Sequence, residues 1–118
     1  MQTVEDLLGE VRQALLNYAY YVSYEIISRG VHYGKFRLVI NRDLFVQVNR
    51  NEQASLTNFA LIYRSQRIYG RDEDRGIWHQ HPFSAPEHHD KGPEGSRSIS
   101  LAEFLAAVDA LLHAERLI

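Results

Sequence analysis

A chain of 118 residues, 45% hydrophobic and 24% charged with a net charge of −2, has the composition of one soluble globular domain. The absence of cysteine excludes disulfides, thiolate metal sites and a cysteine nucleophile, and no apolar run approaches the roughly 18 residues of a membrane span. The first residues lack the basic start and apolar core of a signal peptide, so we expect a single cytoplasmic domain over residues 1–118 with no membrane partner.

The first segment has the apolar spacing of an amphipathic helix. Thr3 followed by Asp6 resembles a capping box, and the predicted helix ends near Asn17. The apolar side chains recur at the i, i+3, i+4, i+7 positions of one stripe: Val4, Leu7, Leu8, Val11, Ala14 and Leu15.

From Tyr18 the apolar period changes to two, which predicts a strand over 18–26. A helix that continues to Ser28 is the competing interpretation. Further on, 35–40 and 44–48 alternate on either side of turn residues, which predicts a β-hairpin.

After a polar loop over 49–55, the patterns of 56–64 and 67–72 predict two more strands around Ser65-Gln66. The result is a mostly antiparallel sheet of about five strands. The next stretch, 78–95, contains all three prolines and little periodicity, so we expect an ordered surface loop at the edge of the sheet or a flexible flap.

The last segment is a second predicted helix. Ser100 and Glu103 form a capping box, and an unbroken helical stripe runs from Leu101 to Leu112. Neither helix can bury its stripe alone, so we expect both on one face of the sheet in a two-layer α+β domain.

Four of the six histidines fall within eleven residues, inside the proline-rich stretch: His79, His81, His88 and His89. Imidazole titrates near neutral pH and is the commonest metal ligand in proteins. The cluster therefore indicates proton transfer, metal binding or both, although loop histidines that only bond to backbone would give the same pattern.

Several short motifs follow one another in a fixed order after the tyrosine-rich predicted sheet. Arg71-Asp72 is followed by His-x-His-Pro, by Pro-x-His-His and by a helix that begins Ser-x-Ser-Leu-x-x-Phe-Leu. This order resembles the TumE-type toxin family of prokaryotic toxin–antitoxin pairs. The resemblance extends over roughly residues 15–115. It implies a toxin with a cognate antitoxin as its partner, and it points to these site residues: Arg71, Asp72, His79, His81, His88 and His89.

The chain departs from the family pattern next to the arginine. There the family has a tryptophan and a compact aspartate-asparagine-alanine-proline run, whereas this chain has Arg71-Asp72-Glu73-Asp74-Arg75-Gly76 with its tryptophan at Trp78. This difference affects the assignment of Asp72 more than that of the histidines.

The same residues suit RNA cleavage without a metal. Such a reaction needs a base for the 2′-hydroxyl, an acid for the leaving oxygen and a cation for the phosphorane. The candidate base is His79 or His81, and the candidate acid is His88 or His89. The candidate phosphate-binding residues are Arg64, Arg67 and Arg71, so we favour a ribonuclease-like enzyme that acts on RNA or nucleotides.

A divalent metal such as Zn²⁺ is the other reading of the cluster. In an extended segment His79 and His81 project to one side and could bind one ion, with His88 or His89 as a third ligand. Asp72 or Asp90 could then orient one of the histidines. The alternative function is a non-catalytic metal-binding or protein-interaction module. The sequence is also compatible with a homodimer.

Overall fold

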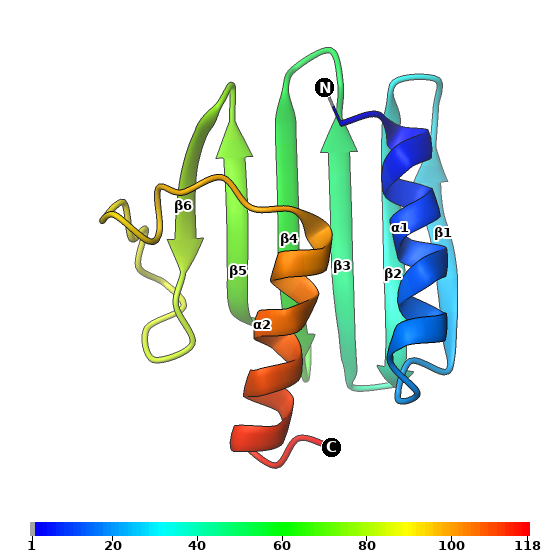
Figure 1. Cartoon of the computed structure of the whole chain (residues 1–118), viewed down its shortest axis with the longest axis vertical. Helices are drawn as coiled ribbons and strands as arrows, with labels where there is room; N and C mark the ends of the chain where they lie inside the picture. The colour runs from blue at the N-terminus through cyan, green and yellow to red at the C-terminus, as the bar shows by residue number, and fades with distance from the viewer. Residues whose placement is uncertain (1) are drawn as a thin grey trace.

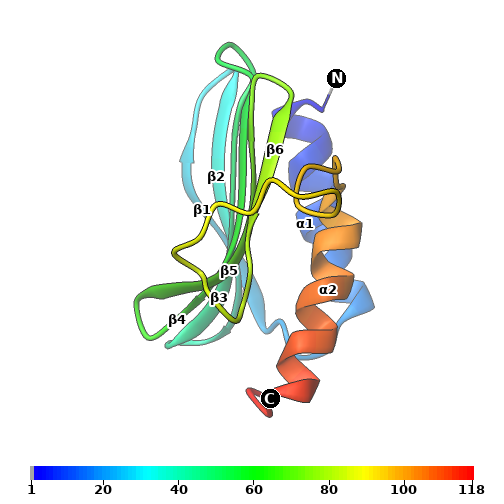
Figure 2. The same cartoon turned by 90° about the vertical axis from the view of Figure 1, so that its left-hand side faces the viewer.

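The computed structural model describes residues 2–118 as a six-stranded antiparallel sheet with two helices. The strand order is β1-β2-β3-β4-β5-β6, so every strand pairs with its neighbour in sequence. Figures 1 and 2 show both helices on the same side of the sheet, which leaves the other face open. The elements are α1 (Val4–Asn17), β1 (Ser23–Arg29), β2 (Tyr33–Asn41), β3 (Leu44–Asn51), β4 (Leu56–Tyr63), β5 (Gln66–Asp74), β6 (Ile77–His81) and α2 (Leu101–Ala114).

Both predicted helices and their capping boxes are confirmed. In α1 the Thr3 side chain accepts a hydrogen bond from the Asp6 N–H, and the Asp6 carboxylate accepts one from the Thr3 N–H. Ser100 and Glu103 form the same reciprocal pair at the start of α2. Each box satisfies N–H groups that the first turn of a helix cannot bond internally.

The hydrophobic core lies between the helices and one face of the sheet. Phe104 of α2 is fully buried, with its ring 5.3 Å from that of Tyr69 on β5 and 5.4 Å from that of Phe59 on β4. Leu8 of α1 is also fully buried in the same cluster. The predicted two-layer α+β arrangement is therefore present, with six strands instead of about five.

The segment between α1 and β1 differs from both interpretations of its sequence. Tyr18 caps α1, and β1 begins only at Ser23, so neither a strand from Tyr18 nor a helix to Ser28 forms. The Tyr20 hydroxyl donates a hydrogen bond of 2.8 Å to Asp109 of α2, and Tyr21 is 4% exposed. Tyr21 is part of the hydrophobic core and Tyr20 packs against it, and these tertiary contacts override the strand-like pattern of the segment.

The sixth strand begins inside the stretch that the sequence indicated as a loop. Arg75 and Gly76 have φ values of 51° and 85° and connect β5 to β6 in a two-residue turn. A two-residue turn with positive φ at both positions has a backbone twist that fits the right-handed twist of the two strands it connects. Trp78–His81 is thus strand, and the loop proper begins at Pro82.

No helix among residues 2–118 is long and apolar enough to cross a membrane.

Candidate functional site

The pairing of β5 with β6 brings Asp72 and two histidines to one face of the sheet. Asp72 lies opposite His79, and Gly70 lies opposite His81. Their neighbour Tyr69 faces the helices, because its ring stacks on Phe104. Side chains alternate along a strand, so Asp72, His79 and His81 point to the open face.

The loop after β6 returns to the strand and adds a third histidine. Gln80 and Asp90 exchange backbone hydrogen bonds of 3.0 and 2.9 Å, and the Gln80 amide donates another of 2.7 Å to the Asp90 carboxylate. The neighbours of this pair point to the opposite face, which places His89 beside His81 with ring centroids 4.7 Å apart. In Figure 2 the loop extends on the side away from the helices before it crosses towards α2.

Two ring nitrogens and one carboxylate oxygen meet at the centre of this cluster. The Nε2 atoms of His79 and His81 are 3.1 Å apart, and they lie 3.3 and 3.2 Å from Oδ2 of Asp72. Nδ1 of His81 lies 2.8 Å from the Pro86 carbonyl oxygen, which only accepts, so Nδ1 carries the hydrogen. Asp72 and His81 are each 8% exposed, His79 is half-buried and His89 is exposed.

Arg67 holds the Asp72 carboxylate in place. Its Nη2 and Nη1 donate hydrogen bonds of 2.6 and 3.0 Å to Oδ1 and Oδ2, and Nη2 also donates to the Phe59 carbonyl. The guanidinium lies over Gly70, where an added Cβ would be 2.1 Å from Nη2. The charge of Arg67 is therefore paired with Asp72 instead of being free for a phosphate.

Burial and neighbouring groups shift the pKa of two members of the cluster. Burial raises the pKa of Asp72, but hydrogen bonds from Arg67 and Asn58 and the nearby positive charge outweigh it, so this pKa lies below its ordinary value. Burial lowers the pKa of His79, and the adjacent imidazoles add to that effect against the attraction of Asp72. Both shifts favour an ionised carboxylate beside a neutral imidazole.

The exposed side of the cluster opens into a cleft. Its lining includes His79 and His89 of the cluster and two basic side chains, Arg75 and Lys91. The Arg75 guanidinium is paired with Asp74 at 2.9 Å, and both side chains are exposed. An anionic ligand in this cleft would lie near the histidines and Lys91, and it would compete with Asp74 for Arg75. The lining is completed by Asp74 and Ile77.

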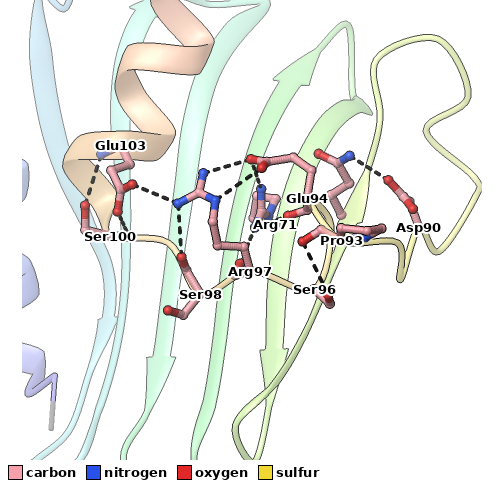
Figure 3. Close-up of polar contacts among 10 residues, drawn as sticks. Arg71, Asp90, Pro93, Glu94, Ser96, Arg97, Ser98, Ser100 and Glu103 are labelled. Atoms are coloured by element: carbon pink, nitrogen blue, oxygen red, sulfur yellow. Dashed lines mark hydrogen bonds and ion pairs between the residues drawn. The ribbon is translucent and has the colours of Figure 1, made fainter.

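Arg71 lies on the other face of the sheet, away from the histidines. It is 1% exposed and donates hydrogen bonds to the carbonyl groups of Glu94 and Arg97. Figure 3 shows it beneath the segment that leads to α2. The expected grouping of Arg71 with the histidines is therefore absent: adjacent residues of β5 point to opposite faces, and only Asp72 faces the cluster.

Two further candidates also lie outside the cluster. Arg64 is in the turn between β4 and β5, and its guanidinium lies 4.9 Å from the centre of the Tyr63 ring. His88 is exposed, and its backbone N–H donates a hydrogen bond to the Ala85 carbonyl. The residues whose ring nitrogens share one site are His79, His81 and His89, all within 4.8 Å of one another.

The regular alternation of side chains between the two faces of a strand does not predict the pairing of Arg67 with Asp72. An odd spacing of five residues would place these side chains on opposite faces. The register shifts between Leu61 and Ile62, whose partners are Tyr69 and Arg67, so Ile68 is an extra residue in β5. This bulge reverses the alternation and turns Arg67 towards Asp72.

No family model, curated protein or solved structure matches the chain. The interpretation of the site therefore depends on its geometry.

Proposed function

We propose that the protein is the toxin of a toxin–antitoxin pair and that it cleaves phosphate esters in RNA or nucleotides. The observation that carries the proposal is the convergence of His79, His81, His89 and Asp72 beside a cleft with basic side chains in its lining. The motif order that resembles TumE-type toxins supports the biological role.

The chemistry of phosphoryl transfer fits this arrangement. The reaction needs a group that takes a proton from the attacking oxygen, a group that protonates the leaving oxygen, and positive charge near the phosphate. Imidazoles at the cleft supply the proton transfers, or they hold a cation that activates water. Because Arg67 is held by the buried Asp72, we assign phosphate binding to Lys91 and to Arg75, whose own ion pair with Asp74 is exposed to solvent.

Controlled expression in bacteria tests the proposal. Cells that express the parent should stop growing and lose RNA, whereas the His79→Ala/His81→Ala variant should do neither. His88→Ala is the matched control, because this exposed histidine lies outside the cluster. Arrest without loss of RNA would overturn the ribonuclease chemistry, and equal toxicity of the double variant would overturn the site.

The second candidate is a non-catalytic module that holds an ion. It is favoured by the burial of Asp72 and His81, whose facing atoms are 3.2 Å apart and have little contact with solvent. This candidate predicts no growth arrest from the parent and no RNA cleavage by the purified protein.

A further inference from the structure

The central atoms of the cluster need a proton or a metal ion between them. Nδ1 of His81 donates to the Pro86 carbonyl, so the Nε2 of a neutral His81 presents a lone pair to the Asp72 carboxylate and to Nε2 of His79. Lone pairs that face one another at this distance repel unless a proton or a metal ion lies between them. These three atoms form a triangle. A proton on one ring can lie between only two of them at a time, whereas one metal ion can bond to all three.

The size of the triangle matches a tetrahedral metal site. Two ligand atoms at about 2.0–2.1 Å from Zn²⁺, at the tetrahedral angle, are separated by about 3.3–3.4 Å. The three edges between His79, His81 and Asp72 measure 3.1, 3.2 and 3.3 Å. The cluster thus has the spacing of three inner ligands before any ion is added.

We propose that Nε2 of His79, Nε2 of His81 and Oδ2 of Asp72 bind one transition-metal ion of the Zn²⁺ class, with His89 as the fourth ligand. The ring nitrogen of His89 lies within 4.8 Å of those of the other two histidines, on an exposed loop where the ring can turn inwards. The inference deepens the proposed function: the catalytic use of the ion rests on that function, but its binding does not.

The surroundings of the cluster support this assignment. Metal-bound histidines usually donate their second N–H to a carbonyl or carboxylate, as His81 does to Pro86. Metal-bound carboxylates are likewise held by hydrogen bonds, and Arg67 supplies two to Asp72. Arg67 is therefore a positioning residue, and its positive charge balances the carboxylate while the ion is absent.

The test uses metal-free protein titrated with Zn²⁺ and, separately, with Co²⁺. One ion should bind per chain, and Co²⁺ should give the intense visible absorption of a tetrahedral site. His79→Ala, His81→Ala and Asp72→Asn should each weaken Zn²⁺ binding by about 100-fold or more, and His89→Ala by about tenfold. His88→Ala and Asp43→Asn, which change an exposed histidine and an exposed aspartate outside the cluster, are the matched controls and should bind like the parent.

A second variant keeps the test decisive if an alanine substitution unfolds the chain. His81→Cys supplies a thiolate, which also binds zinc, so it should retain Zn²⁺ binding where His81→Ala does not. Less than one ion per chain, or equal binding by parent and Asp72→Asn, would overturn the inference. Tight zinc binding without growth arrest would overturn the proposed function alone. RNA cleavage by metal-free protein would overturn the catalytic use of the ion and leave its binding to be judged by the titrations.

Discussion

Arg67 and Asp72 meet side by side, with two hydrogen bonds of 2.6 and 3.0 Å between guanidinium and carboxylate. This bidentate geometry fixes the plane of the carboxylate and directs Oδ2 towards the histidines. It requires a bulge that turns Arg67 to the open face and a glycine that leaves room for the guanidinium. The site thus depends on two features of β5 that carry no chemistry themselves.

Gly70→Ala should impair the site more than the fold. The new Cβ would displace the end of the flexible Arg67 side chain, so we expect the free energy of unfolding to change by less than about 1 kcal/mol. Loss of the Arg67 contact should weaken zinc binding by about tenfold or more. Urea denaturation and zinc titration measure the two effects. Gly30→Ala, with open space around the added Cβ, is the control, and unchanged binding by Gly70→Ala would contradict the role of Arg67.

Arg71→Met should destabilise the protein by about 3 kcal/mol in urea denaturation. The buried guanidinium bonds to two carbonyl groups of the segment before α2. The substitution leaves the Arg97 carbonyl without this partner and the Glu94 carbonyl with only the backbone N–H of Arg97. Arg75→Met removes an exposed arginine and should change stability by less than about 0.5 kcal/mol. Equal losses in the two variants would contradict the structural role of Arg71.

Gly9→Ala should stabilise the protein by about 0.5–1 kcal/mol. Gly9 is exposed in the interior of α1 with nothing near an added Cβ, so alanine gains helix propensity without a clash. Gly76→Ala should have the opposite sign and cost about 1 kcal/mol, because Gly76 has a φ of 85° in the turn before β6. Thermal unfolding of the two variants would reveal the contrast.

Stability should fall at acid pH partly through Glu103. Hydrogen bonds from the Ser100 N–H and the Arg97 side chain hold the pKa of Glu103 below its usual 4.5. A carboxyl group with a lowered folded pKa contributes stability above its unfolded pKa and loses it as pH falls through the folded pKa. Urea midpoints between pH 6 and pH 2 should therefore drop less for Glu103→Gln than for the parent. Parallel curves would contradict the contribution of this carboxylate.

Zinc should raise the thermal stability of the parent, and a chelator should reverse the effect. Binding to the folded state alone, at about 100 times Kd, adds about 2.7 kcal/mol to the free energy of unfolding. His81→Ala should lose this response, whereas His113→Ala, altered at an exposed histidine of α2, should keep it. A shift of equal size in His81→Ala would place the bound zinc elsewhere.

The helices and the central hairpins were predictable because their signals are local. Reciprocal capping by Ser100 and Glu103 spans three residues, and the alternation of β2 and β3 needs no information from outside the hairpin. The segment from Tyr18 to Tyr21 could not be predicted this way, since the hydroxyl of Tyr20 bonds to Asp109, 89 positions along the chain. Contacts between residues this far apart in the sequence cannot be predicted from the local spacing of apolar residues.

The sequence indicates which histidines lie close together, but it does not indicate the contacts that hold them and Asp72 in place. The spacing of His79 and His81 indicates a common side in any extended segment, and the pairing of β6 with β5 gives that result. The pairing of Arg67 with Asp72 depends on a bulge that the sequence does not reveal. His88 and His89 could be told apart only through the Gln80–Asp90 bridge. A shift of one residue exchanges the faces of a strand, so small irregularities decide which side chains meet.

The connectivity of the sheet has a consequence for the order in which the molecule folds. Every strand pairs with its sequence neighbour, and the contacts among Arg67, Asp72, His81 and Pro86 each join residues no more than nine positions apart. Such short loops close at little entropic cost, whereas α1 and α2 meet only after most of the chain has collapsed. We therefore expect the β5–β6 hairpin to assemble the polar cluster early, before the hydrophobic layer that covers its other face is complete.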